Sequence, residues 1–255
     1  MGVAPDQLGC ATWTLDNHQA IEYVSKAVDA FRSVDHGRIA YELSQVAWLL
    51  CEQLDETGES LAQAAAAAED ALNQAQRLRF PGGLAVAKRV MGLVSMYRGD
   101  VDLARAYLAE AKERFGALQR RGSLIGVLGS QADNELMSGN VKAAAEYVTE
   151  IETLRRDSGT SPDAFDFALR GRVCLGTGDV AKGMRYLQKA LLANRAAGTE
   201  EGMAYALWLL GSGFLLDGQS EIATRVLAAF RATQHRLKRA FPVLDEQQSK
   251  SISPI

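Results

Sequence analysis

The sequence predicts an all-α fold, a right-handed α-solenoid of about six antiparallel helix-turn-helix repeats that ends in a C-terminal capping segment. Three observations support this prediction. Alanine and leucine are abundant and only 7% of the residues are aromatic, which favours helix over sheet. A turn followed by a helical pattern returns about every 40 residues. Within each copy, small and apolar residues stand four and then three positions apart, which places them on one face of a helix.

The repeat begins, in its clearest copies, with a glycine turn that leads into a helix. These copies are GDVDLARAYLAEA from Gly99, GNVKAAAEYVTEI from Gly139, GDVAKGMRYLQKA from Gly178 and GQSEIATRVLAAF from Gly218. The same register extends back to LDNHQAIEYVSKA from Leu15 and ESLAQAAAAAEDA from Glu59. In each copy a small residue should open a buried stripe. The six positions are Ala20, Ala64, Ala104, Ala144, Gly183 and Ala223.

Another set of helices is expected between these, at residues 37–56, 83–98, 123–138, 162–176 and 200–216. These are the first helices of the helix pairs, and the helices with the buried stripe are the second helices. Gly92, Gly171 and Gly211 each stand twelve residues before the small residue of the following helix, and Ala132 takes the equivalent place in the fourth copy. A glycine within a helix costs about 1 kcal/mol relative to alanine. Its recurrence therefore predicts that two helices cross closely at this point.

Helix ends are indicated by capping residues and by breaks. Asp16, Asp100, Asn140 and Asp179 stand where a short polar side chain can cap the first turn of a helix. Residues 80–83, 157–162 and 197–199 contain proline or glycine and should interrupt the helices. We expect a repeat domain over residues 1–240, with an incomplete first repeat, and a tail over 241–255.

The pattern resembles tetratricopeptide (TPR) repeats, whose signature has Trp, Gly, Ala and Leu at set places. Trp48, Gly92, Ala104, Leu108 and Ala111 match several of them. The period of about 40 is longer than the usual period of about 34. This longer variety is similar to the helical arrays of bacterial signalling ATPases and transcriptional regulators. No Walker-type phosphate loop and no DNA-reading helix-turn-helix is present, so the resemblance implies the sensor or scaffold portion of such a regulator.

Charge gives little reason to expect nucleic acid as a direct partner. The formal net charge is −3, which provides no general attraction for a polyanion. A basic run near the C-terminus is interpreted as the solvated face of a last helix. It consists of Arg225, Arg231, Arg236, Lys238 and Arg239.

Three cysteines, Cys10, Cys51 and Cys174, lie far apart and form neither a CxxC pair nor an even disulfide framework. This spacing predicts a reducing, cytoplasmic setting. The N-terminal segment lacks the pattern of a signal peptide, and no window is apolar enough for a membrane span. We therefore expect no membrane partner.

The candidate site is the concave surface, which the first helix of each pair should line. Asp133 and Arg172 occupy equivalent positions on adjacent first helices and are expected to pair. Arg89 has no acidic residue in the same register, so it could bind a carboxylate or phosphate. The predicted ligand- or peptide-binding residues are Arg89, Tyr97, Asp133, Phe165, Arg172, Tyr205 and Trp208.

An alternative interpretation gives these apolar residues a structural role. Met96, Phe165 and Trp208 would then pack between neighbouring repeats and contact no ligand. The Asp133–Arg172 pair would likewise be a structural salt bridge. The lining does not match the carboxylate clamp of tetratricopeptide co-chaperones, so binding of a chaperone tail is not expected.

Catalysis is not predicted. His18, His36 and His235 are isolated, and no cluster has the spacing of a metal site. Asp163 and Asp166 share a helix face, but acidic residues in a first turn are expected from the helix dipole. The predicted function is a protein- or peptide-binding scaffold or regulatory module without a cofactor. A sensor of a small-molecule effector is the alternative, a helical enzyme is less favoured, and a homodimer is one form that the partner could take.

Overall fold

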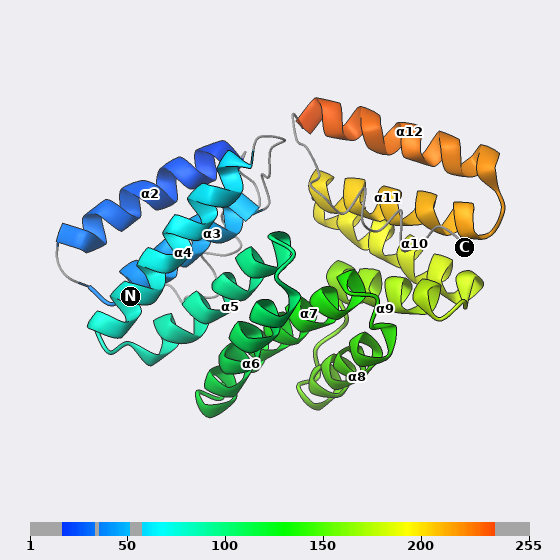
Figure 1. Ribbon diagram of the computed structural model, residues 1–255. Coiled ribbons are helices and arrows are strands. Elements are labelled where there is room, and N and C mark those ends of the chain that lie inside the picture. Colours follow the sequence, from blue (N-terminus) through cyan, green and yellow to red (C-terminus); the bar gives the residue numbers. More distant parts are fainter. Residues whose placement is uncertain (1–16, 34–35, 52–57, 238–255) are drawn as a thin grey trace. The chain divides into compact units, whose positions relative to one another are not determined.

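The computed structural model describes residues 17–33, 36–51 and 58–237, and within these ranges it contains eleven α-helices and no strand (Figure 1). The predicted all-α fold class is therefore confirmed. The contacts divide the chain into two compact units, Met1–Gln119 and Arg120–Ile255. The predicted cap Asp16 and the predicted tail, 241–255, lie outside the described residues.

Unit 1 is a stack of helices in which each helix packs against the next. Its helices are α2 (Asn17–Ser33), α3 (Ile39–Cys51), α4 (Glu59–Arg77), α5 (Pro81–Tyr97) and α6 (Val101–Ala117). The first helices α3 and α5 also touch one another. A core of mostly small residues, including Ala47, Ala64, Ala68, Val90 and Val94, fills the space between them.

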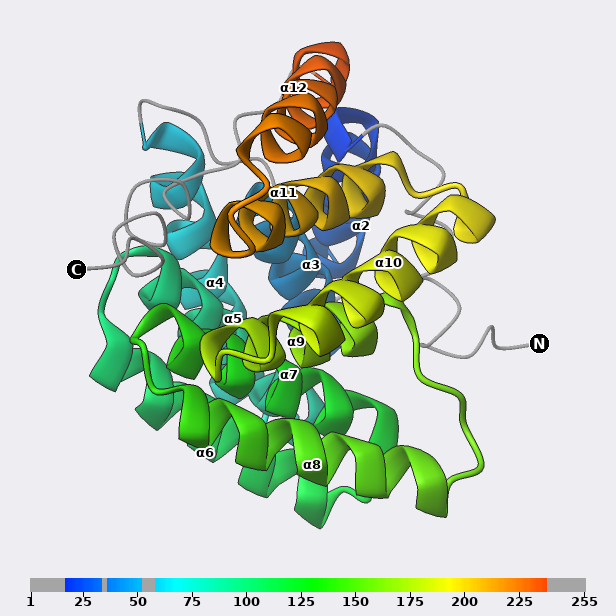
Figure 2. The same ribbon diagram turned by 90° about the vertical axis from the view of Figure 1, so that its right-hand side faces the viewer.

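Unit 2 repeats this arrangement. Its helices are α7 (Arg121–Met137), α8 (Val141–Asp157), α9 (Ala164–Gly176), α10 (Val180–Ala197), α11 (Glu200–Leu216) and α12 (Ser220–Leu237). Each packs against its neighbour in sequence, as Figure 2 shows for α10, α11 and α12. The first helices α7, α9 and α11 touch in succession, which brings equivalent positions of three repeats together.

The buried stripe predicted on the second helices is present. On α6 it consists of Ala104, Leu108 and Ala111, all without exposed surface. On α2 the stripe departs from the prediction, because Val28 is buried and Ala27 is only half-buried. On α12 the middle residue of the stripe, Leu227, is also only half-buried. The offset of four then three residues thus identifies the core face fully on α4, α6, α8 and α10.

The glycines expected at helix crossings do lie against the partner helix. A Cβ atom at Gly92 would stand 2.7 Å from Cγ of Leu108. At Gly171 it would stand 2.5 Å from Cδ2 of Leu187, and at Gly211 it would stand 2.5 Å from Cδ2 of Leu227. No real Cβ atom fits at such distances, so each glycine allows an approach that alanine would obstruct.

Two kinds of turn alternate along the chain, and both keep the repeat register. The turns within the repeat segments use glycine with positive φ at Gly99, Gly139, Gly178 and Gly218. The turns that lead into the first helices also need a positive φ. In unit 2 this is supplied by Gly159 before α9 and Gly198 before α11. In unit 1 the same place is taken by Arg79 (φ 48°) and Gln119 (φ 54°). A side chain at such an angle is strained.

The helix starts differ in detail from the prediction. Helix α5 begins at Pro81, two residues before the expected start, because proline is well suited to the first helical position, where its missing N–H is not needed. Asn140 and Asp179 do cap α8 and α10 with their side chains. Asp100 stands at the N-cap of α6, but its side chain makes no capping hydrogen bond.

Candidate binding face

Arg172 joins the three first helices of unit 2. Its Nη1 donates to Oδ1 of Asp133 on α7 and, at 3.0 Å, to the hydroxyl oxygen of Tyr205 on α11. Only 7% of the Arg172 side chain and 18% of the Asp133 side chain are exposed. The pairing expected from the repeat register is therefore present, and Tyr205 is a third member that the register did not predict as a partner.

The electrostatics of this group follow from its burial. Burial acts to lower the pKa of the Arg172 guanidinium, but the Tyr205 and Asp133 oxygens outweigh it, so that pKa stands above its ordinary value. Burial raises the pKa of the Asp133 carboxyl, and the charge of Arg172 opposes that rise. A charge-assisted hydrogen bond shielded from water is stronger than one at the surface. The group thus fixes the relative positions of α7, α9 and α11.

Trp208 extends this group on its apolar side. Its ring stacks on that of Tyr205 with the centroids 6.0 Å apart. Trp208 is only 8% exposed and belongs to a core cluster that also contains Leu187 and Leu209. Packing is therefore its main role, as the alternative interpretation proposed, and little of its surface is accessible to a ligand. We call Asp133, Arg172, Tyr205 and Trp208 the Arg172 cluster.

Phe165 is the accessible member of the predicted set, because 44% of its surface is exposed. It lies in the first turn of α9, and its ring contacts α7 at Gly129, where a Cβ atom would stand 2.5 Å from Cε1. The glycine therefore lets an exposed aromatic ring rest on the backbone of the neighbouring first helix. Exposed aromatic rings held in one position suit the anchoring of a partner.

Arg89 and Tyr97 belong to unit 1, on helix α5. Arg89 is half-buried, and burial lowers its pKa. It also makes an interaction of its own, so the expectation of an arginine with no partner is not met. Tyr97 is half-buried against the core cluster of α3, α4 and α5.

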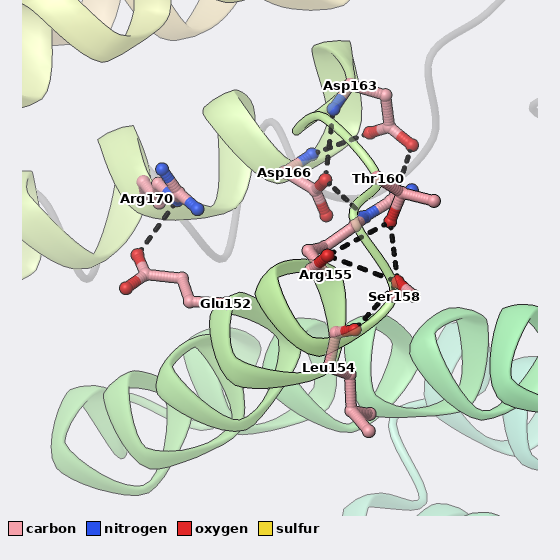
Figure 3. Close-up of polar contacts among 8 residues, drawn as sticks. All are labelled: Glu152, Leu154, Arg155, Ser158, Thr160, Asp163, Asp166 and Arg170. Atoms are coloured by element: carbon pink, nitrogen blue, oxygen red, sulfur yellow. Dashed lines mark hydrogen bonds and ion pairs between the residues drawn. The ribbon is translucent and has the colours of Figure 1, made fainter.

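Helix α9 is anchored to α8 by a network that Figure 3 shows. Arg155, near the end of α8, places Nη2 2.5 Å from Oδ2 of Asp163 and Nε 2.9 Å from Oδ2 of Asp166. The two aspartates also form a capping box, since each side chain accepts a 3.0 Å hydrogen bond from the backbone N–H of the other. The first turn of α9, which carries Phe165, is therefore firmly held.

This network could have been found in part from the sequence. An acidic residue followed three positions later by another, just after a break, is a capping pattern. The contribution of Arg155 could not be found, because it depends on how the loop at 158–163 returns towards α8. Burial raises the pKa of Asp166, while the N–H of Asp163 and the charge of Arg155 oppose that rise.

The sequence also raised metal sites, reactive cysteines and membrane spans as features to be tested. Among the described residues there is no group of three or more His, Cys, Asp or Glu that could hold a metal ion. Cys51 is buried, and burial raises the pKa of the half-buried Cys174 thiol, which lowers its nucleophilicity at neutral pH. In the described part of the chain, every helix is too short or too polar to cross a bilayer.

The basic run near the C-terminus is exposed as far as the structure describes it. Arg225, Arg231 and Arg236 lie on the solvent side of α12, and Arg236 pairs with Glu200 at 3.1 Å. Lys238 and Arg239 lie outside the described residues. The run is thus a solvated helix face over the part that can be seen.

Comparison with known proteins identifies the fold. No protein-family model matches the chain, and no curated protein matches it. Among solved structures, BtubC (BKLC) from P. vanneervenii is similar, with a TM-score of 0.61 and 15% identity over 90% of this chain and 95% of its own. A putative kinesin light chain with nearly identical TPR-like repeats from Podosopora anserina, and a single-substitution form of it, give TM-scores of 0.52 and 0.53. Both are 17% identical over 80% of this chain and 99% of theirs.

Proposed function

We propose that this protein, whose fold is that of TPR-like helical repeats, is a protein- or peptide-binding module whose partner docks on the face formed by α7, α9 and α11. The observation that carries the proposal is the exposed ring of Phe165, which lies on α9 and packs on α7, two of the first helices that the buried Arg172 cluster joins. A stack of repeats is an extended and rigid support that suits binding better than catalysis.

The arrangement supports a division of roles on this face. Arg172 is neutralised by Asp133 and nearly buried, so its role is to position α7, α9 and α11. Phe165 supplies apolar contact area at a low cost in side-chain entropy, because the capping box and the Arg155 network already fix its helix turn. A partner with an apolar anchor residue is expected to cover this ring.

A sensor of a small-molecule effector is the second candidate, because the exposed ring of Phe165 would suit stacking on a planar organic ligand. Either role would fit a regulatory protein of the bacterial cytoplasm. The length of the repeat suggested such a regulator, and the spacing of the cysteines suggested a cytoplasmic setting. The regulator assignment rests on the sequence resemblance, to which the 15% and 17% identities add nothing beyond the fold.

The test is native mass spectrometry of the tagged protein purified gently from its own cells, with Phe165→Ala as the binding variant. Ile222→Ala is the matched control, because Ile222 is 41% exposed and lies on the second helix α12. An added protein mass that is lost only in Phe165→Ala would support the proposal, and a doubled mass would identify a second copy as the partner. An added mass of a few hundred daltons would favour the effector sensor. Equal retention by both variants would refute docking on this face.

A further inference from the structure

Helix α10 carries a positive surface on a protein whose net charge is negative. Between Val180 and Ala197 it contains four cationic residues and no acidic residue. Lys182, Arg185 and Lys189 are exposed and stand three and four positions apart, so that they share one helix face. Neighbouring like charges repel, and this arrangement does not help the helix to fold.

Two aromatic rings lie beside this face, on α9 and α10. The Nζ of Lys189 stands 5.8 Å from the ring centroid of Phe167 and 5.7 Å from that of Tyr186. From α9, the guanidinium carbon of Arg170 approaches the same rings at 6.0 and 5.8 Å. Two cations and two half-buried rings thus form one cluster on the α9–α10 surface. Cation–π contacts hold these charges in place without neutralising them.

Acidic residues near this cluster leave most of its charge uncompensated. Glu152 on α8 pairs with Arg170 at 2.9 Å, as Figure 3 shows. Asp179 accepts a hydrogen bond from the backbone N–H of Lys182 as the cap of α10. Over the described part of the chain, the side chains of Lys182, Arg185 and Lys189 make no ion pair.

An apolar residue completes the same face. Leu192 stands three positions after Lys189 and is 62% exposed, the largest exposed fraction among the big apolar side chains in the described part of the chain. A leucine in this position contributes almost nothing to the core. When another molecule covers Leu192, its apolar surface is removed from water, and this stabilises the complex.

We propose that the α10 face, formed by Lys182, Arg185, Lys189 and Leu192 with the rings of Phe167 and Tyr186, docks an acidic peptide segment that carries an apolar residue. The occupant is inferred from charge complementarity, because three uncompensated cations attract carboxylates while Leu192 and the rings accept an apolar side chain. This goes beyond the docking on α7, α9 and α11, since it is a separate surface with a different partner chemistry. Nucleic acid is disfavoured because it would use the cations and leave Leu192 exposed.

The test measures binding of a fluorescein-labelled acidic amphipathic peptide of about 15 residues, with glutamates and leucines on one helical face, by fluorescence anisotropy. Lys182→Glu/Lys189→Glu reverses two charges of the α10 face. Arg225→Glu/Arg231→Glu is the matched control, because it makes the same net-charge change on exposed positions of α12. Helicity of both variants is checked by circular dichroism.

The expected result is micromolar binding by the unchanged protein, weakened about tenfold or more by the α10 reversal and about twofold or less by the α12 reversal. Leu192→Ser should weaken binding about fivefold without changing its salt dependence. Phe165→Ala should leave it unchanged, so failure of the α7–α9–α11 proposal would not affect this result. Absence of peptide binding, equal loss in both charge reversals, or tighter binding of a single-stranded oligonucleotide of equal charge would each overturn the proposal.

Discussion

Replacing Gly171 with alanine tests the close crossing of α9 and α10 on which unit 2 depends. The new Cβ would stand 2.5 Å from Cδ2 and 2.6 Å from Cγ of Leu187, and 3.2 Å from the carbonyl oxygen of Gly183. Leu187 has no exposed surface, so it has no solvent-filled space into which to move. The helices must therefore separate or the leucine must leave its preferred rotamer.

The magnitude follows from two opposing effects. Overpacking of a dense core costs about 1–3 kcal/mol, and this site stands at the upper end because the carbonyl oxygen of Gly183 is also close. Alanine regains about 1 kcal/mol of helix propensity over glycine. Gly171→Ala should therefore lower the free energy of unfolding by about 2 kcal/mol. Gly211→Ala should cost less, because its contact, Leu227, is half-buried and can turn towards solvent.

The assay is chemical denaturation followed by circular dichroism, with hydrogen exchange used to locate the loss in α9 and α10. Gly122→Ala is the control, because nothing stands within 4 Å of its added Cβ and it should be neutral or stabilising. In a Leu187→Ala background, the cost of Gly171→Ala should largely disappear, since the colliding atoms are gone. If Gly171→Ala is as stable as the unchanged protein, or its cost persists in that background, the reasoning is refuted.

Three further predictions concern charge and backbone. Arg172→Met should lower the free energy of unfolding by about 2–4 kcal/mol, because it leaves Asp133 mostly buried without a counter-charge. The double variant Arg172→Met/Asp133→Leu should lose less stability than Arg172→Met alone. Denaturant titration of both variants measures the difference. Arg79→Gly and Gln119→Gly should each increase the free energy of unfolding by about 0.5–1 kcal/mol and so raise the thermal midpoint, because both positions have a positive φ. A lower thermal midpoint would contradict the strain. Because burial raises the native pKa of Asp166, the native state keeps this proton to higher pH than the unfolded chain, so its contribution to stability is lost as pH rises from about 4 through the native pKa. Urea titrations at a series of pH values should therefore show that the free energy of unfolding falls less from acid to neutral pH in Asp166→Asn than in the unchanged protein. The same pH dependence in both proteins would disprove the raised pKa of Asp166.

The Arg172 cluster shows how far reasoning from repeats can reach. Asp133 and Arg172 could be paired in advance, because equivalent positions on adjacent first helices are close whenever the repeats stack regularly. Tyr205 could not be added, since it stands at a different register position and reaches Arg172 only through the offset between α9 and α11. The burial of Trp208 depends on the same offset and on the size of its neighbours in the core.

The α10 face was not identified from the sequence for a related reason. A basic helix face is usually a solvated one, and the charges of α10 were not distinguishable from that case. The contacts of Arg170 and Lys189 with the rings of Phe167 and Tyr186 depend on the rotation of α9 against α10. Only the packed helices bring those four side chains into one cluster.

The sequence by itself determined the helices, their buried stripes, the glycine crossings and most of the turns, because these depend on local conformational preference and on a period that repeats along the chain. The tertiary structure alone decided which side chains of different helices meet, how much of Phe165 and Leu192 stays exposed, and where Arg155 finds its partners. The physical reason is that helix formation is governed by interactions within a few residues. Contacts between helices are governed by crossing angles and offsets, which are set jointly by all the side chains in the interface.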